Sequence, residues 1–178
     1  METLKIVFLK GGSNTGKSTA FRNLKKLKEK GLLDNWVLID HTELKGWFKK
    51  VDNKRELQKE CLFSIIKDCM KQKKNILIEE MSQKTARKYL KNYVRKFGYE
   101  LITFEFIVDN VKTSELRDLE RVKNKEDRNQ RKSLGQKFIA ENHEMHRGNL
   151  DKDCIFVNTS KLGKIQTINF IIKSLNLK

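Results

Sequence analysis

The sequence predicts an α/β fold in which a parallel sheet lies between two layers of helices. Short apolar stretches typical of buried strands alternate along the chain with longer stretches in which apolar residues recur at the helical period. One apolar stretch leads directly into the glycine-rich segment 11–19, and a helical pattern begins where that segment ends. Strands that alternate with helices in this way are typical of a parallel sheet joined by right-handed crossovers.

Each expected strand is a run of apolar residues, and the first run is interrupted only by Lys5. Because such runs have no polar side, they indicate strands that are covered by helices on both faces. The expected strands cover residues 4–9, 36–39, 76–78, 101–108 and 154–157. Their carboxyl ends would meet along one edge of the sheet, where ligands of such folds bind.

Helices are expected between the strands and after the last one. The first ends near Gly31, a long one runs from about Lys54 to Gln72, and others follow Ser82 and cover about 134–147. The polar stretch 113–137 is expected to form a solvated helical pair, because it is dense in charged residues. The closing helix carries Leu162, Ile165, Ile168, Ile172 and Leu175.

The length and composition predict a single domain, 1–178, because 178 residues can bury one core but are too few for two ordinary ones. Charged residues make up 35% of the chain, and no apolar run is long enough to span a membrane. The first residues lead straight into a strand, unlike a signal peptide. We therefore expect a cytoplasmic protein without a membrane partner, while its oligomeric state stays open.

The cysteines and histidines indicate no disulfide framework and no zinc site. Cys61, Cys69 and Cys154 are odd in number, and the first two fall on the apolar side of the long helix, which fits buried reduced thiols. His143 and His146 lie three residues apart, but no cysteine or histidine pair with zinc-site spacing accompanies them.

The segment Gly11-Gly12-Ser13-Asn14-Thr15-Gly16-Lys17-Ser18-Thr19 matches the phosphate-binding pattern G-x-x-x-x-G-K-[ST] without a gap. Its glycines let the backbone curl so that N–H groups face a phosphate, and the following helix adds the positive charge of its N-terminus. Lys17 is expected to neutralise the β and γ phosphates of a nucleoside triphosphate, and the Ser18 hydroxyl to bind Mg²⁺. All residues from Gly11 to Thr19 are therefore candidate nucleotide-binding residues.

Acidic residues follow two of the expected strands. Asp40 comes directly after the strand 36–39, where it can accept a proton from an acceptor hydroxyl or can cap the next helix in a capping box with Glu43. Glu79 and Glu80 follow the strand 76–78, and either can reach a Mg²⁺ ion. We take Asp40 as the candidate base and Glu79 as the candidate metal residue.

Arginines are concentrated in the polar stretch, which we expect to form a lid over about 113–137. A guanidinium on such a lid can close over a nucleotide and stabilise charge on the transferred phosphoryl group. The candidates are Arg117, Arg121, Arg128 and Arg131. Some of them can instead pair at helical spacing with Glu115, Asp118, Glu120, Glu126 and Asp127.

The net charge of +16, with a pI near 9.8, has two interpretations. An excess of this size attracts polyanions and is typical of proteins that act on nucleic acid. Lysines are also scattered over every expected helix, which fits a merely lysine-coated surface. The charge therefore makes nucleic acid a candidate partner without requiring it.

The phosphate-binding loop, Asp40 at the end of the second strand and the arginine-bearing lid together resemble the small P-loop kinases. That group includes the 5′-hydroxyl polynucleotide kinases, zeta toxins and chloramphenicol phosphotransferase. The resemblance implies a P-loop NTPase sandwich of three layers, with a five-stranded parallel sheet in the order 2-3-1-4-5 and helices on both faces. It also implies that Asp40 is the general base and that Arg121 and Arg128 contact the ATP phosphates.

Within this group the sequence points in two directions. The Gly-Gly-Ser start of the loop, the run from Arg117 to Gly135 and a histidine at 143 or 146 are similar to chloramphenicol phosphotransferase. Polynucleotide kinases usually have an arginine three residues after the base, and here Glu43 occupies that position. The basic surface favours a nucleic acid.

The function that we expect is a kinase that uses ATP and Mg²⁺ to phosphorylate an acceptor hydroxyl. Lys17, Asp40, Arg121 and Arg128 are the candidate catalytic residues. Arg117 and Arg131 are expected to help bind the nucleotide, and Ser18 and Glu79 the metal. A nucleic-acid or nucleotide 5′-hydroxyl ranks ahead of a small molecule as acceptor. The alternatives are an NTPase or nucleotide-dependent binding protein, and a basic nucleic-acid-binding protein with a vestigial loop.

Overall fold

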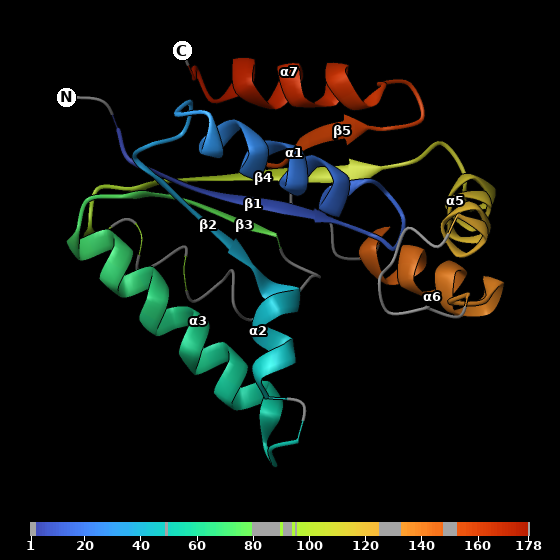
Figure 1. The fold of residues 1–178 in the computed structure, drawn as a ribbon, viewed down its shortest axis with the longest axis horizontal. Helices are drawn as coiled ribbons and strands as arrows, with labels where there is room; N and C mark the ends of the chain where they lie inside the picture. The colour runs from blue at the N-terminus through green and yellow to red at the C-terminus, as the bar shows by residue number, and fades with distance from the viewer. Residues whose placement is uncertain are drawn as a thin grey trace.

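The computed structural model describes residues 3–48, 50–79, 90, 94, 96–124, 133–147 and 153–177. Within these ranges the chain forms a five-stranded, fully parallel sheet in the order β2-β3-β1-β4-β5, which confirms the expected fold (Figure 1). The strands are β1 (Lys5–Gly11), β2 (Trp36–Asp40), β3 (Asn75–Glu79), β4 (Glu100–Ile107) and β5 (Ile155–Asn158).

Helices cover both faces of the sheet (Figure 1). The helices α1 (Lys17–Glu29) and α7 (Lys164–Ser174) pack on one face, and α3 (Lys54–Lys71) packs on the other. Strand β1 lies at the centre, where Val7 and Leu9 face α1 while Ile6 and Phe8 face α3. All four of these side chains are buried, which explains why the strand is apolar on both sides.

Three further helices lie near the carboxyl ends of the strands. The helix α2 (His41–Trp47) begins directly after β2, with Asp40 as its N-cap. The helices α5 (Val111–Lys123) and α6 (Gln136–Arg147) lie side by side beyond the ends of β1 and β4 (Figure 1). The helix expected after Ser82 is described only at Leu90, Val94 and 96, and both apolar side chains are buried against the α3 side of the sheet.

Within the stretch 113–137 the structure describes 113–124 and 133–137, and most of α5 is exposed or half-buried, as its composition predicted. Ser114 and Asp118 are exceptions, at 0% and 2% exposed: Ser114 Oγ lies 2.9 Å from His143 Nε2 of α6, and Asp118 Oδ1 accepts from Asn14 of the loop. A charged stretch usually faces water, so the composition gave no sign that these two polar side chains would be buried with hydrogen-bond partners on the loop and on α6.

Two smaller expectations need correction. Ile165 of the closing helix is 77% exposed, whereas Ile168, Ile171 and Leu175 are buried. Cys61 and Cys69 are free thiols, as expected, but they are half-buried rather than buried. In the ranges that the structure describes, no helix is both long and apolar enough to cross a membrane.

We expect Gly11→Ala to destabilise the protein by about 2–4 kcal/mol. Gly11 has a φ of 139°, and a Cβ there would lie 2.3 Å from the backbone oxygen of Phe106, so β1 and β4 would have to separate. Denaturant unfolding measures the effect. Gly46→Ala is the matched control: it has no atom within 4 Å of the new Cβ and should gain up to about 1 kcal/mol from helix propensity. Equal midpoints for both variants would contradict this account.

Candidate active site

The glycine-rich loop joins β1 to α1 and curls at residues with positive φ. Gly16 (φ 99°) is the N-cap of α1, where no side chain caps the helix and no acidic residue stands in the first turn. Asn14, at the middle of the loop, is in the left-handed region with φ 58°, which asparagine tolerates better than most residues. The N-terminus of α1 therefore presents a positive end to an anion at the loop.

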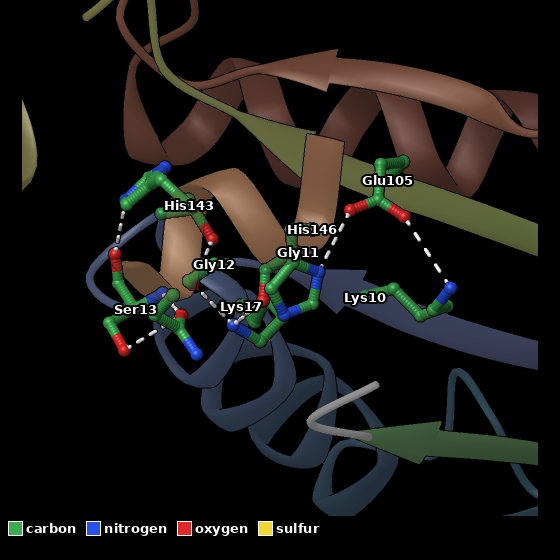
Figure 2. A network of polar contacts seen from close by, with 10 residues as sticks. Lys10, Gly11, Gly12, Ser13, Lys17, Glu105, His143 and His146 are labelled. Atoms are coloured by element: carbon green, nitrogen blue, oxygen red, sulfur yellow. Dashed lines mark hydrogen bonds and ion pairs between the residues drawn. The ribbon is translucent and has the colours of Figure 1, made fainter. Parts of the chain in front are cut away.

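Lys17 lies beneath this curl. Its side chain is buried, and Nζ donates to the carbonyl oxygens of Gly11 at 2.6 Å and Gly12 at 2.7 Å (Figure 2). Thr15 Oγ1 donates to the Gly12 oxygen at 2.9 Å, which closes the loop on itself. The loop thus folds around an ammonium group, and its positive charge is already in place where an anion on the loop would meet it.

Ser18 and Glu79 join α1 to the end of β3. Ser18 Oγ donates to Glu79 Oε1 at 2.5 Å, and the Glu79 side chain is buried. Burial raises the pKa of Glu79 above its usual value, and the nearby Asp40 charge adds to the effect. The Ser18 hydrogen bond, Lys17 and Arg22 oppose it. A buried carboxylate beside a hydroxyl is a pair of hard oxygen donors, which suits a Mg²⁺ ion.

Asp40 lies next to Glu79, because the two residues are register partners at the ends of β2 and β3. Its Oδ1 accepts a hydrogen bond of 2.7 Å from the backbone N–H of Thr42, so the carboxylate caps α2. The capping role that the sequence left open is confirmed. The cap occupies one carboxylate oxygen and keeps the group at the edge of the sheet that carries the loop.

Two of the predicted arginines reach the loop from α5. Arg117 Nη1 donates to the backbone oxygen of Asn14 at 3.2 Å and to Thr159 Oγ1 at 2.9 Å, and Nη2 donates to the Thr159 backbone oxygen at 2.8 Å. Burial, with Arg121 close by, lowers the pKa of Arg117. Arg121 Nη1 donates to Asn14 Oδ1 at 2.9 Å. Arg128, Arg131 and Glu80 lie outside the described residues.

A cavity of about 270 Å³ opens between the loop, α5 and the connection from β5 to α7. Gly16, Thr19 and Ala20 line it on the α1 side, Arg117, Glu120 and Arg121 on the α5 side, and Thr159, Leu162 and Lys164 on the third side. It adjoins the N-terminus of α1, so a molecule whose anionic end lies on the loop can extend into it.

The helix α6 holds the outer side of the loop through residues that the sequence did not single out for this role. Asn142 Oδ1 accepts from Ser13 N at 2.7 Å and from Ser13 Oγ at 3.1 Å. His143 Nε2 lies 3.1 Å from the Ser13 oxygen and 2.9 Å from Ser114 Oγ. A carbonyl only accepts, so Nε2 carries a proton, and burial lowers the pKa of His143. A Cβ on Gly12 would lie 3.0 Å from this imidazole.

A second charged cluster lies on the opposite face of the sheet from α1. Lys10 and Glu105 are register partners at the ends of β1 and β4, and Lys10 Nζ lies 3.8 Å from Glu105 Oε2 (Figure 2). His146 Nδ1 of α6 lies 3.5 Å from Glu105 Oε1. All three side chains are buried. The signal in the sequence was a glutamate inside the expected strand 101–108 and a lysine directly after the expected strand 4–9.

Comparisons with known proteins support the fold. A gluconokinase from Sinorhizobium meliloti 1021 matches with a TM-score of 0.64 at 11% identity, over 99% of this chain and 94% of that one. A tunicamycin resistance protein from Deinococcus radiodurans matches with a TM-score of 0.62 at 14% identity, over 98% and 97%. A sugar kinase from Janibacter sp. HTCC2649 matches with a TM-score of 0.60 at 14% identity, over 98% of this chain and 95% of that one. The chain shares its fold with these proteins.

This likeness extends over the whole length of the chain, but identities of 11–14% transfer no residue role and no substrate. Neither a scan against protein-family models nor a search of curated proteins gave a match. The chemistry of the site must therefore be argued from its own residues.

We expect Glu79→Gln to stabilise the protein at neutral and alkaline pH. In the folded state the pKa of Glu79 lies above the usual 4.5. The wild-type protein therefore loses stability as the pH rises from 4.5 through the pKa of the folded state, whereas the Gln variant has no carboxyl group to ionise and keeps its stability. Below pH 4.5 both side chains are neutral and the two unfolding free energies should converge. Urea unfolding from pH 4 to pH 8 measures this. Glu29→Gln, on an exposed residue of α1, is the control. A Glu79→Gln variant that is less stable at pH 8 would contradict the assignment.

Proposed function

We propose that the protein is a kinase that transfers the γ-phosphate of ATP to an acceptor hydroxyl in the presence of Mg²⁺. The observation that carries the proposal is the contact between Ser18 and Glu79 beside Asp40. It brings the hydroxyl of the phosphate-binding motif, a buried carboxylate and a candidate base to one edge of the sheet. Phosphoryl transfer requires such a grouping next to a phosphate-binding loop.

The donor nucleotide is proposed to lie along the loop from Gly11 to Thr19, with its phosphates at the N-terminus of α1 and over Lys17. Its base and ribose would enter the cavity of about 270 Å³ beside Thr19 and Thr159. Arg117 and Arg121 border both the loop and the cavity, which supports the proposal that they contact phosphate oxygens. The assignments of Arg128 and Arg131 remain predictions.

The residues fit a Mg²⁺ ion that retains most of its water. In the described part of the chain, no group of three or more His, Cys, Asp or Glu side chains is arranged to hold a metal by itself. Mg²⁺ is usually held by one or two protein oxygens together with substrate phosphates, and Ser18 and Glu79 supply such oxygens. When bound, the ion would neutralise charge on the β and γ phosphates.

Asp40 is proposed as the general base. The carboxylate accepts the proton of the acceptor hydroxyl while that oxygen bonds to the γ-phosphorus and the bond to the bridging oxygen of ADP breaks. Its hydrogen bond to Thr42 N fixes the orientation of the side chain and leaves Oδ2 for the acceptor. In an NTPase or a nucleotide-gated binding protein, the alternative class, Asp40 would have only the capping role.

We propose a nucleic-acid or nucleotide 5′-hydroxyl as the acceptor, because the chain carries a net charge of +16. Lys54, Arg55, Lys71 and Lys73 are exposed on and beside α3, on the face of the sheet away from α1. A small-molecule acceptor is the second candidate. Two observations support this second candidate. An arginine three residues after Asp40 would favour a polynucleotide, and Glu43 occupies that position. Two proteins with a similar fold are named gluconokinase and sugar kinase.

We expect label from γ-labelled ATP to appear on single-stranded DNA or RNA with a 5′-hydroxyl, and less on nucleosides or small alcohols. Transfer to the oligonucleotide should fall steeply between 50 and 200 mM salt, by about tenfold or more, because phosphate contacts release counterions. Lys17→Ala should remove transfer to every acceptor, and Lys26→Ala, on the exposed side of α1, is the charge-matched control. Label only on small alcohols, insensitive to salt, would assign the second acceptor class. No label on any acceptor would refute the kinase.

We expect Asp40→Asn to lower phosphoryl transfer by about 10²–10⁴. Asparagine is as good an N-cap as aspartate, so the variant should retain the bond to Thr42 N and unfold within about 0.5 kcal/mol of the wild type. Single-turnover transfer and denaturant unfolding measure the two effects separately. If transfer survives in Asp40→Asn, the residue is a cap only and is not the base. If the wild type hydrolyses ATP without transfer and Asp40→Asn leaves that hydrolysis intact, the alternative class of nucleotide-dependent protein is favoured.

A further inference from the structure

Asn14 makes more contacts to α5 than its place in the phosphate-binding motif explains. Its side chain is 8% exposed, although it lies on a loop. Its Nδ2 donates to Asp118 Oδ1 at 3.2 Å, and its Oδ1 accepts from Arg121 Nη1 at 2.9 Å. The motif itself allows any residue at this position, so these contacts are a feature of this chain.

Only one orientation of the Asn14 carboxamide satisfies both neighbours. A guanidinium only donates and an ionised carboxylate only accepts, so the amide nitrogen must face Asp118 and the amide oxygen must face Arg121. Asp118 thereby decides which atom Asn14 presents to Arg121. An alanine at position 14 would offer neither group, and an aspartate would repel Asp118.

Asp118 is itself held firmly. It is 2% exposed, and its Oδ2 accepts from Ser133 Oγ and from the backbone N–H of Leu134, both at 2.7 Å. The carboxylate thus links α5 to the residues that precede α6 and, through Oδ1, to the loop. Three donors on one buried carboxylate fix its position more firmly than a single contact would.

We propose that Asp118 and Asn14 are positioning residues that hold the guanidinium of Arg121 over the phosphate-binding loop. Asp118 orients the carboxamide of Asn14, and Asn14 orients Arg121. The inference rests on the proposed function, in which Arg121 contacts the phosphates of the bound nucleotide. A long arginine side chain loses considerable rotamer entropy when it is ordered, so an arginine that is already oriented binds phosphate more tightly.

The test is the affinity for Mg²⁺-ATP, measured by titration calorimetry. In Asp118→Asn the new amide oxygen can still accept from Ser133 and Leu134, but the new amide nitrogen then faces the nitrogen of Asn14. The Asn14 amide must therefore rotate, and its nitrogen then faces the guanidinium of Arg121. We expect this variant to bind about three- to tenfold more weakly. Glu115→Gln removes the same charge from the same helix and has no part in the cluster, so it should stay within about twofold of the wild type.

The decisive comparison is made in the Arg121→Ala background. If Asp118 acts through Arg121, then Asp118→Asn should weaken binding by less than about 1.5-fold once the guanidinium is absent. An equal loss in both backgrounds means that Asp118 supports the fold alone, and it overturns the proposal. An unchanged or tighter affinity for Asp118→Asn also overturns it.

Denaturant unfolding without nucleotide provides a second measurement that does not depend on the proposed function. The double variant Asn14→Asp with Asp118→Asn exchanges the two side chains and restores complementary contacts. The carboxylate now at position 14 would accept from the carboxamide now at position 118 and from Arg121. Its unfolding midpoint should exceed that of either single variant. If the wild type binds no Mg²⁺-ATP, the proposed function fails, and the comparison of unfolding midpoints alone tests the positioning of Arg121. A midpoint of the double variant at or below those of the single variants overturns the positioning proposal.

Discussion

The hydrogen bond between Ser18 and the buried carboxylate of Glu79 joins the two halves of the candidate site. Ser18 belongs to the first turn of α1, directly after the phosphate-binding loop, and Glu79 ends β3, the strand that lies between β1 and β2. Burial of the Glu79 carboxylate costs stability at neutral pH, because it removes the charge from water and raises the pKa, and the Ser18 hydrogen bond offsets part of this cost. A bound cation would stabilise the ionised form of this carboxylate and would recover the stability that its burial costs.

The loop is held from its other side by α5 and α6. Arg117 and Asp118 contact Asn14, while Asn142 and His143 contact Ser13, so side chains more than a hundred residues away in the sequence shape the loop before any ligand is bound. The loop is therefore preorganised, and a ligand need not supply the free energy of ordering it.

The sequence predicted most of the fold and the side of the site formed by the strands. Apolar runs located the strands, and a contiguous motif located the loop. Asp40 and Glu79 could be placed together because the ends of parallel strands share one edge. The contacts of Asn142, Asp118 and Glu105 could not be predicted, because each depends on how a distant helix packs. The polar composition of α5 suggested solvation, although Ser114 is buried with His143 of α6 as its partner and Asp118 with Asn14 of the loop.

The two described arginines of α5 have different tasks. Arg117 makes three hydrogen bonds to the Asn14 backbone and to Thr159, and burial lowers its pKa, so its guanidinium joins the loop to the end of β5. Movement of this group toward a phosphate would leave the Thr159 contacts unsatisfied. Arg121 is one turn further along the same helix. Its guanidinium donates to the side chain of Asn14, a loop residue, and this contact holds it at the loop. In the proposed kinase, charge that builds on the transferred phosphoryl group would be met most directly by Arg121, while Arg117 would keep the loop in the shape that this contact requires.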